Sequence, residues 1–493
     1  MSGIAVSYGS SEEADLKRML SKLEHRGELS GIESLDNISM GYRSNHVNQL
    51  IGDETPGESD TFSINGKACA VCDGYLFNDE LFDHDNSSLV AGMFQEKGTR
   101  FVEDLEGTFA LAVTDGSSFL VARDPFGIKP LYYGNEKGTT YFASEIKELV
   151  EVTEDINVFP PGHYYTPRHG FQPYGQVAGE KRVITKDPEK AARQLKQLMV
   201  QAVERRFLEN ERPGILLSGG LDSSVVAAAA RNITENLETF SVGLWGSPDL
   251  EAARLVARHL GSKHREHVYT EEEIMQVLAQ VIYHLESFDA PLVQSAIANY
   301  FASKLAAEAG CHSILCGEGA DELFGGYHYV KDLGSEEAVE QELMNIISIG
   351  HAMGFQRVDR MNSAHSLESH VPFMDQDVVE FAAAVPLDWK IFGKEQTEKW
   401  ILRTAFTHDL PEKIVWRRKA QFSHGTGCNK MMEQVAEARI SDEEFYKAQN
   451  ENEGIMLRTK EECLYYHIFK TFYPQDSAAQ SVVQWSSLEG DNT

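Results

Sequence analysis

Two patterns of apolar and polar positions divide the chain. The first 150 or so residues carry short apolar runs broken by Gly, Asn and Asp, as in 62–78 and 107–124. This pattern is typical of antiparallel strands joined by tight turns, and one early helix is predicted over 12–27. From residue 187 onward, long helical patterns alternate with short apolar runs at 214–217, 239–244 and 312–317. That alternation predicts a parallel sheet in a doubly wound α/β domain, with ligands at the carboxyl ends of the strands.

The two patterns predict two domains. An α+β domain of stacked antiparallel sheets with helices is expected over 2–175, and the α/β domain over 187–475. The change falls between about 170 and 187, where Pro, Gly and aromatic residues gather. Residues 476–493 place few apolar side chains in register, so we expect a disordered tail there.

The most specific motif follows the first strand of the α/β part. An apolar run leads into two glycines and several hydroxyl side chains, and an Ala-rich helix comes next. The residues concerned are Ser218, Gly219, Gly220, Ser223 and Ser224. Backbone N–H groups and a helix N-terminus then converge on an anion, which fits phosphate or pyrophosphate. Asp222 lies inside the turn where other phosphate loops carry a lysine, and an acid beside phosphates indicates a bridging divalent cation.

A second loop follows a later strand and is rich in acids and glycines. Within 316–327, Glu318, Asp321 and Glu322 occur together with Gly317 and three further glycines. Unpaired carboxylates are costly to bury, so this segment is either a solvated loop or a loop that binds metal and substrate. Asp375 and Lys419 lie in segments that would pass for ordinary loops on their own. Lys419 would have a catalytic role if its side chain reached a phosphate group during transfer, because negative charge develops there.

Composition limits the partners and the cellular location that we expect for this chain. The chain has 76 acidic and 45 basic residues and a formal net charge of −31, which disfavours nucleic acid and anionic membranes as partners. Without a transmembrane or leader pattern, a cytoplasmic location is expected. The six cysteines form no regular framework. For Cys69 and Cys72 a buried strand is favoured over a metal or redox pair, since residues three apart point to opposite faces.

Five motifs together resemble the asparagine synthetase family. They are SGGLDSS at 218–224, SVGLWGSPD at 241–249, CGEGADELFGGY at 316–327, AHSLESHVPFMD at 364–375 and WRRKAQFSHGTG at 416–427. In the N-terminal half, HRG at 25–27 and ARDPFGIKPLYY at 122–133 agree as well. The resemblance implies an Ntn-hydrolase-like glutaminase (class II amidotransferase) domain joined to an ATP-pyrophosphatase domain.

The resemblance also implies roles for individual residues. ATP and Mg²⁺ would be bound by a pyrophosphate loop at 218–224, with Gly317 beside it, Asp222 and Asp321 as metal ligands, and Leu216 and Val242 lining the adenine site. Glu318, Asp375 and Lys419 would form the catalytic or substrate-binding group. The implied reaction is adenylation of a carboxylate with release of pyrophosphate, followed by displacement of AMP by ammonia or another amine. A homodimer is one option left open.

The glutaminase site departs from the family pattern. The family's N-terminal cysteine nucleophile is replaced by Ser2, and its Asn-Gly-Glu segment reads Asp73-Gly74-Tyr75. A serine hydroxyl is a much weaker nucleophile than a thiol near neutral pH, and a carboxylate opposes a developing oxyanion. Further changes fall on Asn86 and on the stretch that begins at Arg43. We interpret the domain as an inactive glutaminase relic, and a hydrolase that depends on Ser2 is the alternative.

The acceptor pocket is predicted to differ too. Where the family has arginines that are expected to help hold aspartate, this chain has Gln294 and His370. Losing two guanidinium groups removes the bidentate partners that a dicarboxylate favours. Three hypotheses follow: an asparagine-synthetase-type ligase that acts on aspartate or an analogue without its own glutamine hydrolysis; a relative, like β-lactam synthetases, that joins a different acid to a substrate amine; and a catalytically silent nucleotide-binding or regulatory protein.

Overall fold

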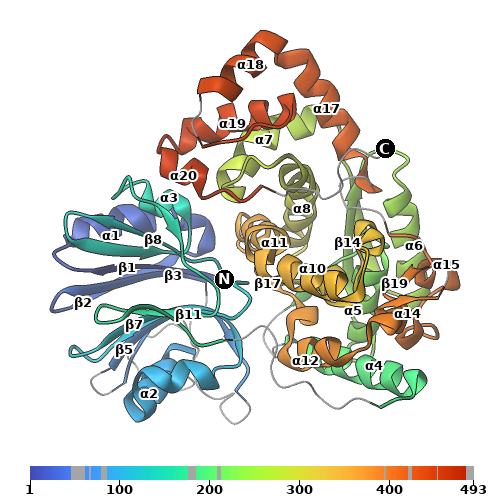
Figure 1. Cartoon of the computed structure of the whole chain (residues 1–493), viewed down its shortest axis with the longest axis horizontal. Coiled ribbons are helices and arrows are strands. Elements are labelled where there is room, and N and C mark those ends of the chain that lie inside the picture. Colours follow the sequence, from blue (N-terminus) through green and yellow to red (C-terminus); the bar gives the residue numbers. More distant parts are fainter. Residues whose placement is uncertain are drawn as a thin grey trace.

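The computed structural model describes residues 1–45, 62–65, 68–78, 86–175, 185–207, 212–393, 396–419, 425–451 and 454–484. Figure 1 shows two parts side by side, a blue-to-teal part built on strands and a green-to-red part rich in helices. No helix among these residues combines the length and apolar character needed to cross a membrane.

The N-terminal part contains two antiparallel sheets of six strands. The first has the order β10-β8-β9-β1-β3-β2 and the second β12-β11-β7-β6-β5-β4. The strands of the first sheet are β1 (Ser2–Tyr8), β2 (Leu29–Leu35), β3 (Ile38–Ser44), β8 (Tyr132–Glu136), β9 (Thr139–Ala143) and β10 (Asn157–Val158). Those of the second are β4 (Phe62–Asn65), β5 (Ala68–Leu76), β6 (Gly107–Thr114), β7 (Phe119–Arg123), β11 (His163–Thr166) and β12 (Gly170–Pro173).

Alternating side chains make this part a layered sandwich. Ile4 and Val6 of β1 pack between the sheets in one cluster with Val71 of β5. On the opposite face of β5, Cys72 packs with Val90 beneath α2 (Asn86–Lys97). The other short helices are α1 (Glu13–Ser21), η1 (Glu24–Arg26), η2 (Gly98–Asp104) and α3 (Ile146–Leu149). The predicted α+β fold is confirmed, and Cys69 and Cys72 are buried thiols outside any disulfide that belong to different clusters.

The C-terminal part is built on a parallel sheet with the strand order β15-β14-β13-β16-β17. Its strands are β13 (Pro213–Leu216), β14 (Glu238–Gly243), β15 (Lys263–Val268), β16 (Ser313–Leu315) and β17 (Glu368–His370). Ile215 in the central strand pairs with Thr239 on one side and Leu315 on the other. The predicted doubly wound α/β architecture is confirmed.

Helices cover both faces of this sheet (Figure 1). The helices up to β17 are α4 (Pro188–Glu204), α5 (Leu221–Arg231), α6 (Pro248–Leu260), α7 (Glu271–Leu285), α8 (Ala290–Glu308), α9 (Ala320–Phe324), η3 (His328–Asp332), α10 (Glu336–Ile349), η4 (Gly350–Ala352) and α11 (Gly354–Ser363). After β17 come η5 (Pro372–Met374), α12 (Gln376–Ala384), α13 (Leu387–Lys390), the hairpin β18 (Ile391–Phe392) and β19 (Thr397–Glu398), α14 (Trp400–Ala405), α15 (Glu412–Val415), α17 (Cys428–Arg439), α18 (Asp442–Glu451), α19 (Lys460–Phe472) and α20 (Asp476–Gln480).

Helix α4, which follows the domain junction, begins at a cap residue and a proline that are typical of helix starts. The Asp187 carboxylate accepts hydrogen bonds from the backbone N–H groups of Glu189 and Lys190 at 3.0 and 3.2 Å, and Pro188 occupies the first turn. Residues 176–184, between β12 and α4, lie outside the described residues.

The tail prediction is wrong for 476–480. Residues 476–480 form α20, in which Ala478 and Ala479 are buried, and the Ser477 hydroxyl donates to the Glu154 carbonyl at 2.5 Å. Two alanines add little to an apolar pattern, yet they fit closely against a preformed surface. Residues 485–493 lie outside the described residues.

Candidate functional site

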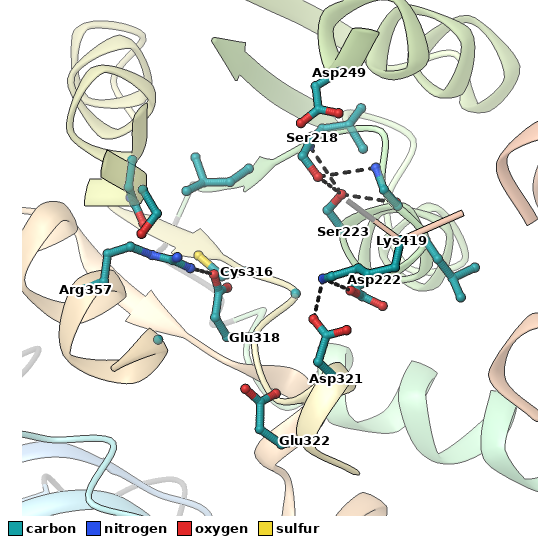
Figure 2. Close-up of a pocket in the computed structure, with 18 of the residues that line it drawn as sticks. Ser218, Asp222, Ser223, Asp249, Cys316, Glu318, Asp321, Glu322, Arg357 and Lys419 are labelled. Atoms are coloured by element: carbon teal, nitrogen blue, oxygen red, sulfur yellow. Dashed lines mark hydrogen bonds and ion pairs between the residues drawn. The ribbon is translucent and has the colours of Figure 1, made fainter. Parts of the chain in front are cut away.

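A cavity of about 370 Å³ opens at the carboxyl ends of β13, β14 and β16 (Figure 2). Its wall brings together most of the residues predicted for nucleotide and metal binding: Leu216, Ser218, Gly220, Asp222, Ser223, Val242, Gly317, Glu318, Asp321 and Lys419. Parallel strands end at one edge of a sheet, so motifs far apart in the sequence meet there.

The phosphate-type loop is held by its own hydroxyl groups. The Ser218 and Ser223 hydroxyls lie 3.0 Å apart, and the backbone N–H of Ser218 donates to the Ser223 hydroxyl at 3.2 Å. Gly219 has φ +71°, and a Cβ there would lie 2.4 Å from the backbone nitrogen of Ala253. The Ser224 hydroxyl donates to the Gly220 carbonyl at 2.6 Å. Gly219 and Ser224 therefore shape the loop without lining the cavity.

Two aspartates and two lysines form the charged centre of the cavity. The Lys399 ammonium lies 2.6 Å from a carboxylate oxygen of Asp222 and 2.6 Å from one of Asp321. Lys419 lies 3.4 Å from Asp222 and also pairs with Asp321. Burial alone would raise the pKa of Asp321, but Lys399 and Lys419 outweigh it and hold that pKa well below its ordinary value. Asp321 is thus held in the ionised form that a metal ion requires.

The donor set fits Mg²⁺. Asp222 and Asp321 supply hard carboxylate oxygens, and their charge is balanced by the same two lysines. A Mg²⁺ ion there would therefore bind together with the negative charge of substrate phosphates. The described residues contain no group of three or more His, Cys, Asp or Glu side chains placed to hold a metal ion. A magnesium ion commonly takes one or two carboxylates and completes its ligands from substrate phosphates and water, and this site could supply such a pair.

Lys399 is a site residue that sequence reasoning missed. Its side chain is 1% exposed, and it follows the hairpin β18–β19 with φ +54°. No local motif marks it, because a lysine in a charged loop usually points to solvent. Only the turn of the chain after β19 directs it into the cavity.

A second charged pair occupies the other side of the cavity. Figure 2 shows Glu318, in the loop after β16, facing Arg357 from α11, well apart from Lys419. Arg357 donates to a Glu318 carboxylate oxygen. The neighbouring wall includes Ser295 and Asn299 from α8. Arg357 was also not predicted, since an arginine within a helix carries no signal of its own.

Asp375 does not line the cavity, and its catalytic role stays a prediction. It precedes α12 and is 3% exposed. Its carboxylate pairs with Arg205 at 3.2 Å and with Arg206 at 2.9 Å. Asp375 therefore fixes the end of α4 against η5 and α12.

Gln294 and His370 do not line the cavity either, and the predicted change of the acceptor pocket stays a prediction. The Gln294 amide donates to both carboxylate oxygens of Glu461 at 2.9 Å, on a buried face of α8. The His370 ring packs edge-on against Tyr75 of the N-terminal part, with centroids 5.0 Å apart. Matching Gln294 to a position in a family motif does not fix which face of α8 it occupies. Successive side chains along a helix are rotated by about 100°, so a neighbouring position points in a different direction.

In the predicted glutaminase site, Ser2 lies in a closed polar cluster. Its hydroxyl donates to Asp73 at 2.8 Å, and the same carboxylate pairs with Lys129 at 3.1 Å and with Arg26 at 3.6 Å. Ser2 is 5% exposed, and Asp73 is fully buried. Burial raises the pKa of Asp73 even though Lys129 and Arg26 oppose the rise.

The other predicted residues of that site are held by the protein itself. The Asn86 amide donates to the Gly74 carbonyl at 2.9 Å and accepts from the Leu76 N–H at 3.1 Å. Arg43 donates to the Leu20 carbonyl at 3.1 Å. The side chains of Asn86 and Arg43 therefore form hydrogen bonds with backbone groups of the N-terminal part. Tyr75 contributes the ring that meets His370.

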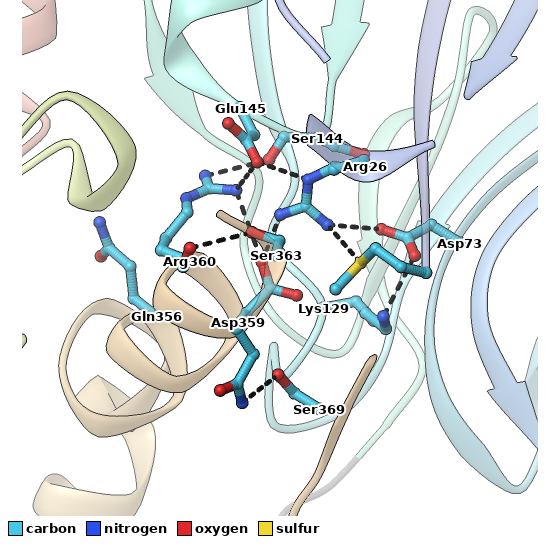
Figure 3. A network of polar contacts seen from close by, with 12 residues as sticks. Arg26, Asp73, Lys129, Ser144, Glu145, Gln356, Asp359, Arg360, Ser363 and Ser369 are labelled. Atoms are coloured by element: carbon cyan, nitrogen blue, oxygen red, sulfur yellow. Dashed lines mark hydrogen bonds and ion pairs between the residues drawn. The ribbon is translucent and has the colours of Figure 1, made fainter. Parts of the chain in front are cut away.

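This cluster extends across the interface between the two parts (Figure 3). Arg26 pairs with Asp359 of α11, and Lys129 donates to Glu368 of β17 at 2.5 Å. A second bridge joins Glu145 to Arg360 of α11 at 3.1 Å. The side chains that make these bridges are at most 3% exposed. Buried charged side chains of each part thus have ion-pair partners in the other part.

Comparisons with known proteins agree with these features. A family model described as asparagine synthase matches residues 194–349 and 332–489, and one described as glutamine amidotransferase domain matches 1–170. "Asparagine synthetase [glutamine-hydrolyzing]" of Triphysaria versicolor is 32% identical, over 98% of this chain and 88% of the relative. "Asparagine synthetase B [glutamine-hydrolyzing]" of Escherichia coli (strain K12) is 32% identical over 93% and 88%. "Probable asparagine synthetase [glutamine-hydrolyzing]" of Dictyostelium discoideum is 31% identical over 98% and 96%.

Proposed function

Because the chain belongs to the asparagine synthetase family, we propose that it is an ATP-dependent ligase that joins a carboxylic acid to ammonia or another amine. The observation that carries this proposal is the group of Asp222, Asp321, Lys399 and Lys419 at the foot of a phosphate-type loop. Two acids and two lysines beside one cavity supply both the means to hold a metal–phosphate group and the charge to stabilise its transfer.

In the first step, an oxygen of the acid attacks the α-phosphorus of ATP. The bond between that phosphorus and the β-phosphate bridging oxygen breaks, and pyrophosphate leaves with the electron pair. Ser218 and Ser223 would bind the departing phosphates, with Lys419 stabilising the charge that develops on them. Mg²⁺, when held by Asp222 and Asp321, would neutralise phosphate charge.

In the second step, the nitrogen attacks the activated carbonyl carbon of the acyl adenylate. The bond from that carbon to the AMP oxygen breaks, AMP leaves with the electrons, and the nitrogen loses a proton to give the amide. The Lys419 ammonium, whose pKa is raised by Asp321 and Asp222 against the effect of burial, stays charged through both steps.

The nitrogen does not come from glutamine hydrolysis at Ser2. A buried hydroxyl that donates to an aspartate shared with Lys129 and Arg26 is poorly placed to attack an amide. The adjoining carboxylate would also oppose an oxyanion. The N-terminal part would then serve as a support for the synthetase part.

The test measures pyrophosphate and AMP formed from ATP and Mg²⁺ with candidate acids, with ammonium or glutamine supplied in turn. We expect acid-dependent AMP formation and an amide product with ammonium, and no glutamate from glutamine. Release with another acid but none with aspartate would favour the ligase for a different acceptor. A protein inert with every acid would overturn the proposal, and glutamate formed from glutamine would overturn its second half.

A further inference from the structure

Helix α8 brings two polar side chains to the wall of the cavity. Ser295 and Asn299 lie four residues apart in this helix, and both line the cavity. Both are buried, with 6% of Ser295 and 1% of Asn299 exposed. Residues four apart are neighbours on one face of a helix. The two side chains therefore form one short polar stripe on the cavity wall.

A buried network fixes the orientation of the Asn299 amide. The Ser369 hydroxyl donates to the Val358 carbonyl at 3.1 Å, so it accepts from the Asn362 amide nitrogen 2.8 Å away. The Asn362 carbonyl oxygen is then turned toward α8, where it accepts from the Ser303 hydroxyl and, at 3.4 Å, from the Asn299 nitrogen. The Asn299 nitrogen also donates to the Ser303 hydroxyl at 3.0 Å. Both hydrogens of the Asn299 amide are thus used within the protein.

The Asn299 carbonyl oxygen is the end of the amide that borders the cavity. It accepts no hydrogen bond from any described residue, and it is not fully enclosed. Ser295 offers the same kind of group, because its hydroxyl donates to the Pro291 and Leu292 carbonyls at 3.0 and 2.9 Å. Its hydrogen is committed to its own helix, while its lone pairs remain. The stripe therefore accepts hydrogen bonds and donates none.

A stripe of acceptors restricts which part of a ligand can bind to it. The phosphates of ATP and an ionised carboxylate are themselves acceptors, so they would leave both oxygens without a partner. A nitrogen that carries two or more hydrogens matches both oxygens at once. With hydrogen bonds of about 2.9 Å and a tetrahedral angle, it spans oxygens about 5 Å apart, close to the spacing of side chains four apart on a helix.

The network behind the stripe carries no charge. Its side chains are amides and hydroxyls, and burial raises the pKa of the Cys316 thiol, which contacts Asn362, well above its ordinary value. A carboxylate in contact with an amine favours the protonated form, whose lone pair cannot attack a carbonyl. Neutral oxygens hold the nitrogen and leave more of it in the reactive form.

The amino group of adenine is the other nitrogen that carries two hydrogens. Leu216 and Val242, predicted to line the adenine site, lie at the carboxyl ends of β13 and β14. Asn299 is tied instead to Asn362, which contacts Cys316 at the end of β16. This placement favours the attacking nitrogen over adenine as the group that meets the stripe.

We propose that Ser295 and Asn299 bind the nitrogen that attacks the acyl adenylate, each oxygen accepting one of its N–H groups. This inference rests on the proposed ligase function and names one wall of the cavity as the subsite for ammonia or a primary amine. Two hydrogens held against α8 turn the lone pair away from the helix and into the cavity. A nitrogen oriented in this way is positioned for attack on the activated carbonyl carbon.

The test separates the two half-reactions. Exchange of labelled pyrophosphate into ATP requires the acid but no nitrogen, so it reports adenylation alone. Aspartate and other candidate acids are compared, and the acid that gives the fastest exchange is used throughout. AMP and amide formation at saturating ATP and acid, with ammonium chloride or methylamine varied at fixed pH, then gives KM for the nitrogen.

For Ser295→Ala and Asn299→Leu we expect KM for the nitrogen to rise about fivefold each, the usual effect of one lost hydrogen bond. The rate of exchange and the KM values for ATP and the acid should equal those of the unaltered protein. In Asn299→Leu, the Ser303 hydroxyl still donates to Asn362, so the carbonyl of that amide keeps a partner. Melting temperatures of both variants would check that the fold is retained.

Two changes on α10 are the matched controls. The Ser348 hydroxyl also donates to a carbonyl of its own helix, that of Asn345 at 2.6 Å, but Ser348 is exposed and does not line the cavity. Ser348→Ala therefore matches Ser295→Ala. Asn345 is likewise exposed and outside the cavity wall, so Asn345→Leu matches Asn299→Leu. Neither control should change any of these values.

An unchanged KM for the nitrogen in both variants, with exchange intact, would overturn this inference alone. Exchange that falls as much as amide formation would also overturn it, by indicating a structural role. So would a rise confined to KM for ATP, which would assign the oxygens to the adenine amino group, or a rise confined to KM for the acid. Exchange without amide from either nitrogen would overturn it as well. If the unaltered protein shows no exchange with any acid, the proposed function fails, and this inference fails with it.

Discussion

The cavity and the N-terminal site both bring aspartates together with lysines, with opposite results. In the cavity, Lys419 is 25% exposed and is shared between Asp222 and Asp321, which are 13% and 14% exposed. At the N-terminal site, Lys129 is 2% exposed and lies between the fully buried Asp73 and Glu368. The same chemical pair is bordered by open volume in one place and by packed protein in the other.

This difference in packing decides whether a charged pair can exchange one partner for a ligand. A pair at the edge of a cavity can exchange a partner for a phosphate or a metal ion, because water and ligand can replace what is lost. A pair inside packed protein cannot exchange, since removing one partner leaves an uncompensated buried charge. The first arrangement suits catalysis, and the second suits the joining of domains.

Replacing Lys419 should give the largest effect on activity. For Lys419→Met we expect AMP formation to fall by about 100- to 1,000-fold, the usual cost of removing one group that stabilises transition-state charge. The melting temperature should change little, because the side chain borders open volume. Lys413→Met, at an exposed position of α15, is the control. An active Lys419→Met enzyme would show that the two lysine sites do not differ as described.

Replacing Lys129 should mainly affect stability. For Lys129→Met we expect a loss of about 3–5 kcal/mol, since Asp73 and Glu368 would lose the cation that lies between them. Scanning calorimetry and circular dichroism would measure it. Lys97→Met is the control, because Lys97 and Asp104 pair on the surface and that pair should have no measurable effect. A melting temperature equal to that of the unaltered protein would show that Lys129 does not stabilise the interface between the two parts.

Acid should weaken the domain interface before it affects the cavity. His284 packs edge-on against His25 of the N-terminal part, with centroids 4.7 Å apart, and burial, with His25 and Lys147, lowers the pKa of His284 to about 2. A histidine whose folded pKa lies below its unfolded value of about 6.5 contributes full stability above that pH and loses it as pH falls. The loss at pH 5 is about 2 kcal/mol.

The variant His284→Gln separates this histidine from other acid-sensitive groups. The drop in melting temperature between pH 7 and pH 5 should be smaller in this variant than in the unaltered protein. The exposed His408, changed to Gln, should leave the drop as it is. Asp321 in the cavity, whose pKa is held well below this range, keeps its charge between pH 7 and pH 5. Equal drops in all three proteins would contradict the assignment.

The smallest effect is expected from restoring the missing thiol. Ser2→Cys should produce no glutaminase activity, because Asp73, Tyr75 and Asn86 still occupy their packed positions. Glutamate formation in the presence of glutamine is the measurement. Recovery by this single change would mean that the N-terminal site is open to substrate and that the serine alone silences it.

Local motifs explain what could be predicted from the sequence. The loop from Ser218 to Ser223 is contiguous and follows a strand, so its place at the edge of the parallel sheet follows from topology alone. The alternation of β5 likewise places Cys69 and Cys72 on opposite faces. Here the chemistry and the element that positions it are adjacent in the chain.

Tertiary placement explains what could not be predicted. Lys399 and Arg357 reach the cavity from a hairpin end and from a helix distant in sequence, and neither has a motif. The rotation of α8 turns Gln294 toward Glu461, away from the cavity. The Asp375 carboxylate pairs with Arg205 and Arg206. These outcomes depend on how elements pack, which the order of residues does not specify locally.

The cysteines of this chain make it a convenient carrier for a chemical label. All six are buried and outside any disulfide, and burial raises the pKa of Cys69 and Cys428 to about 12 and that of Cys311 to about 11. Since a thiolate is the reactive form, maleimides and disulfide reagents should leave the folded protein untouched. One cysteine added on an exposed helix would then accept a fluorophore alone, so distances within the molecule could be followed in solution without first stripping the native thiols.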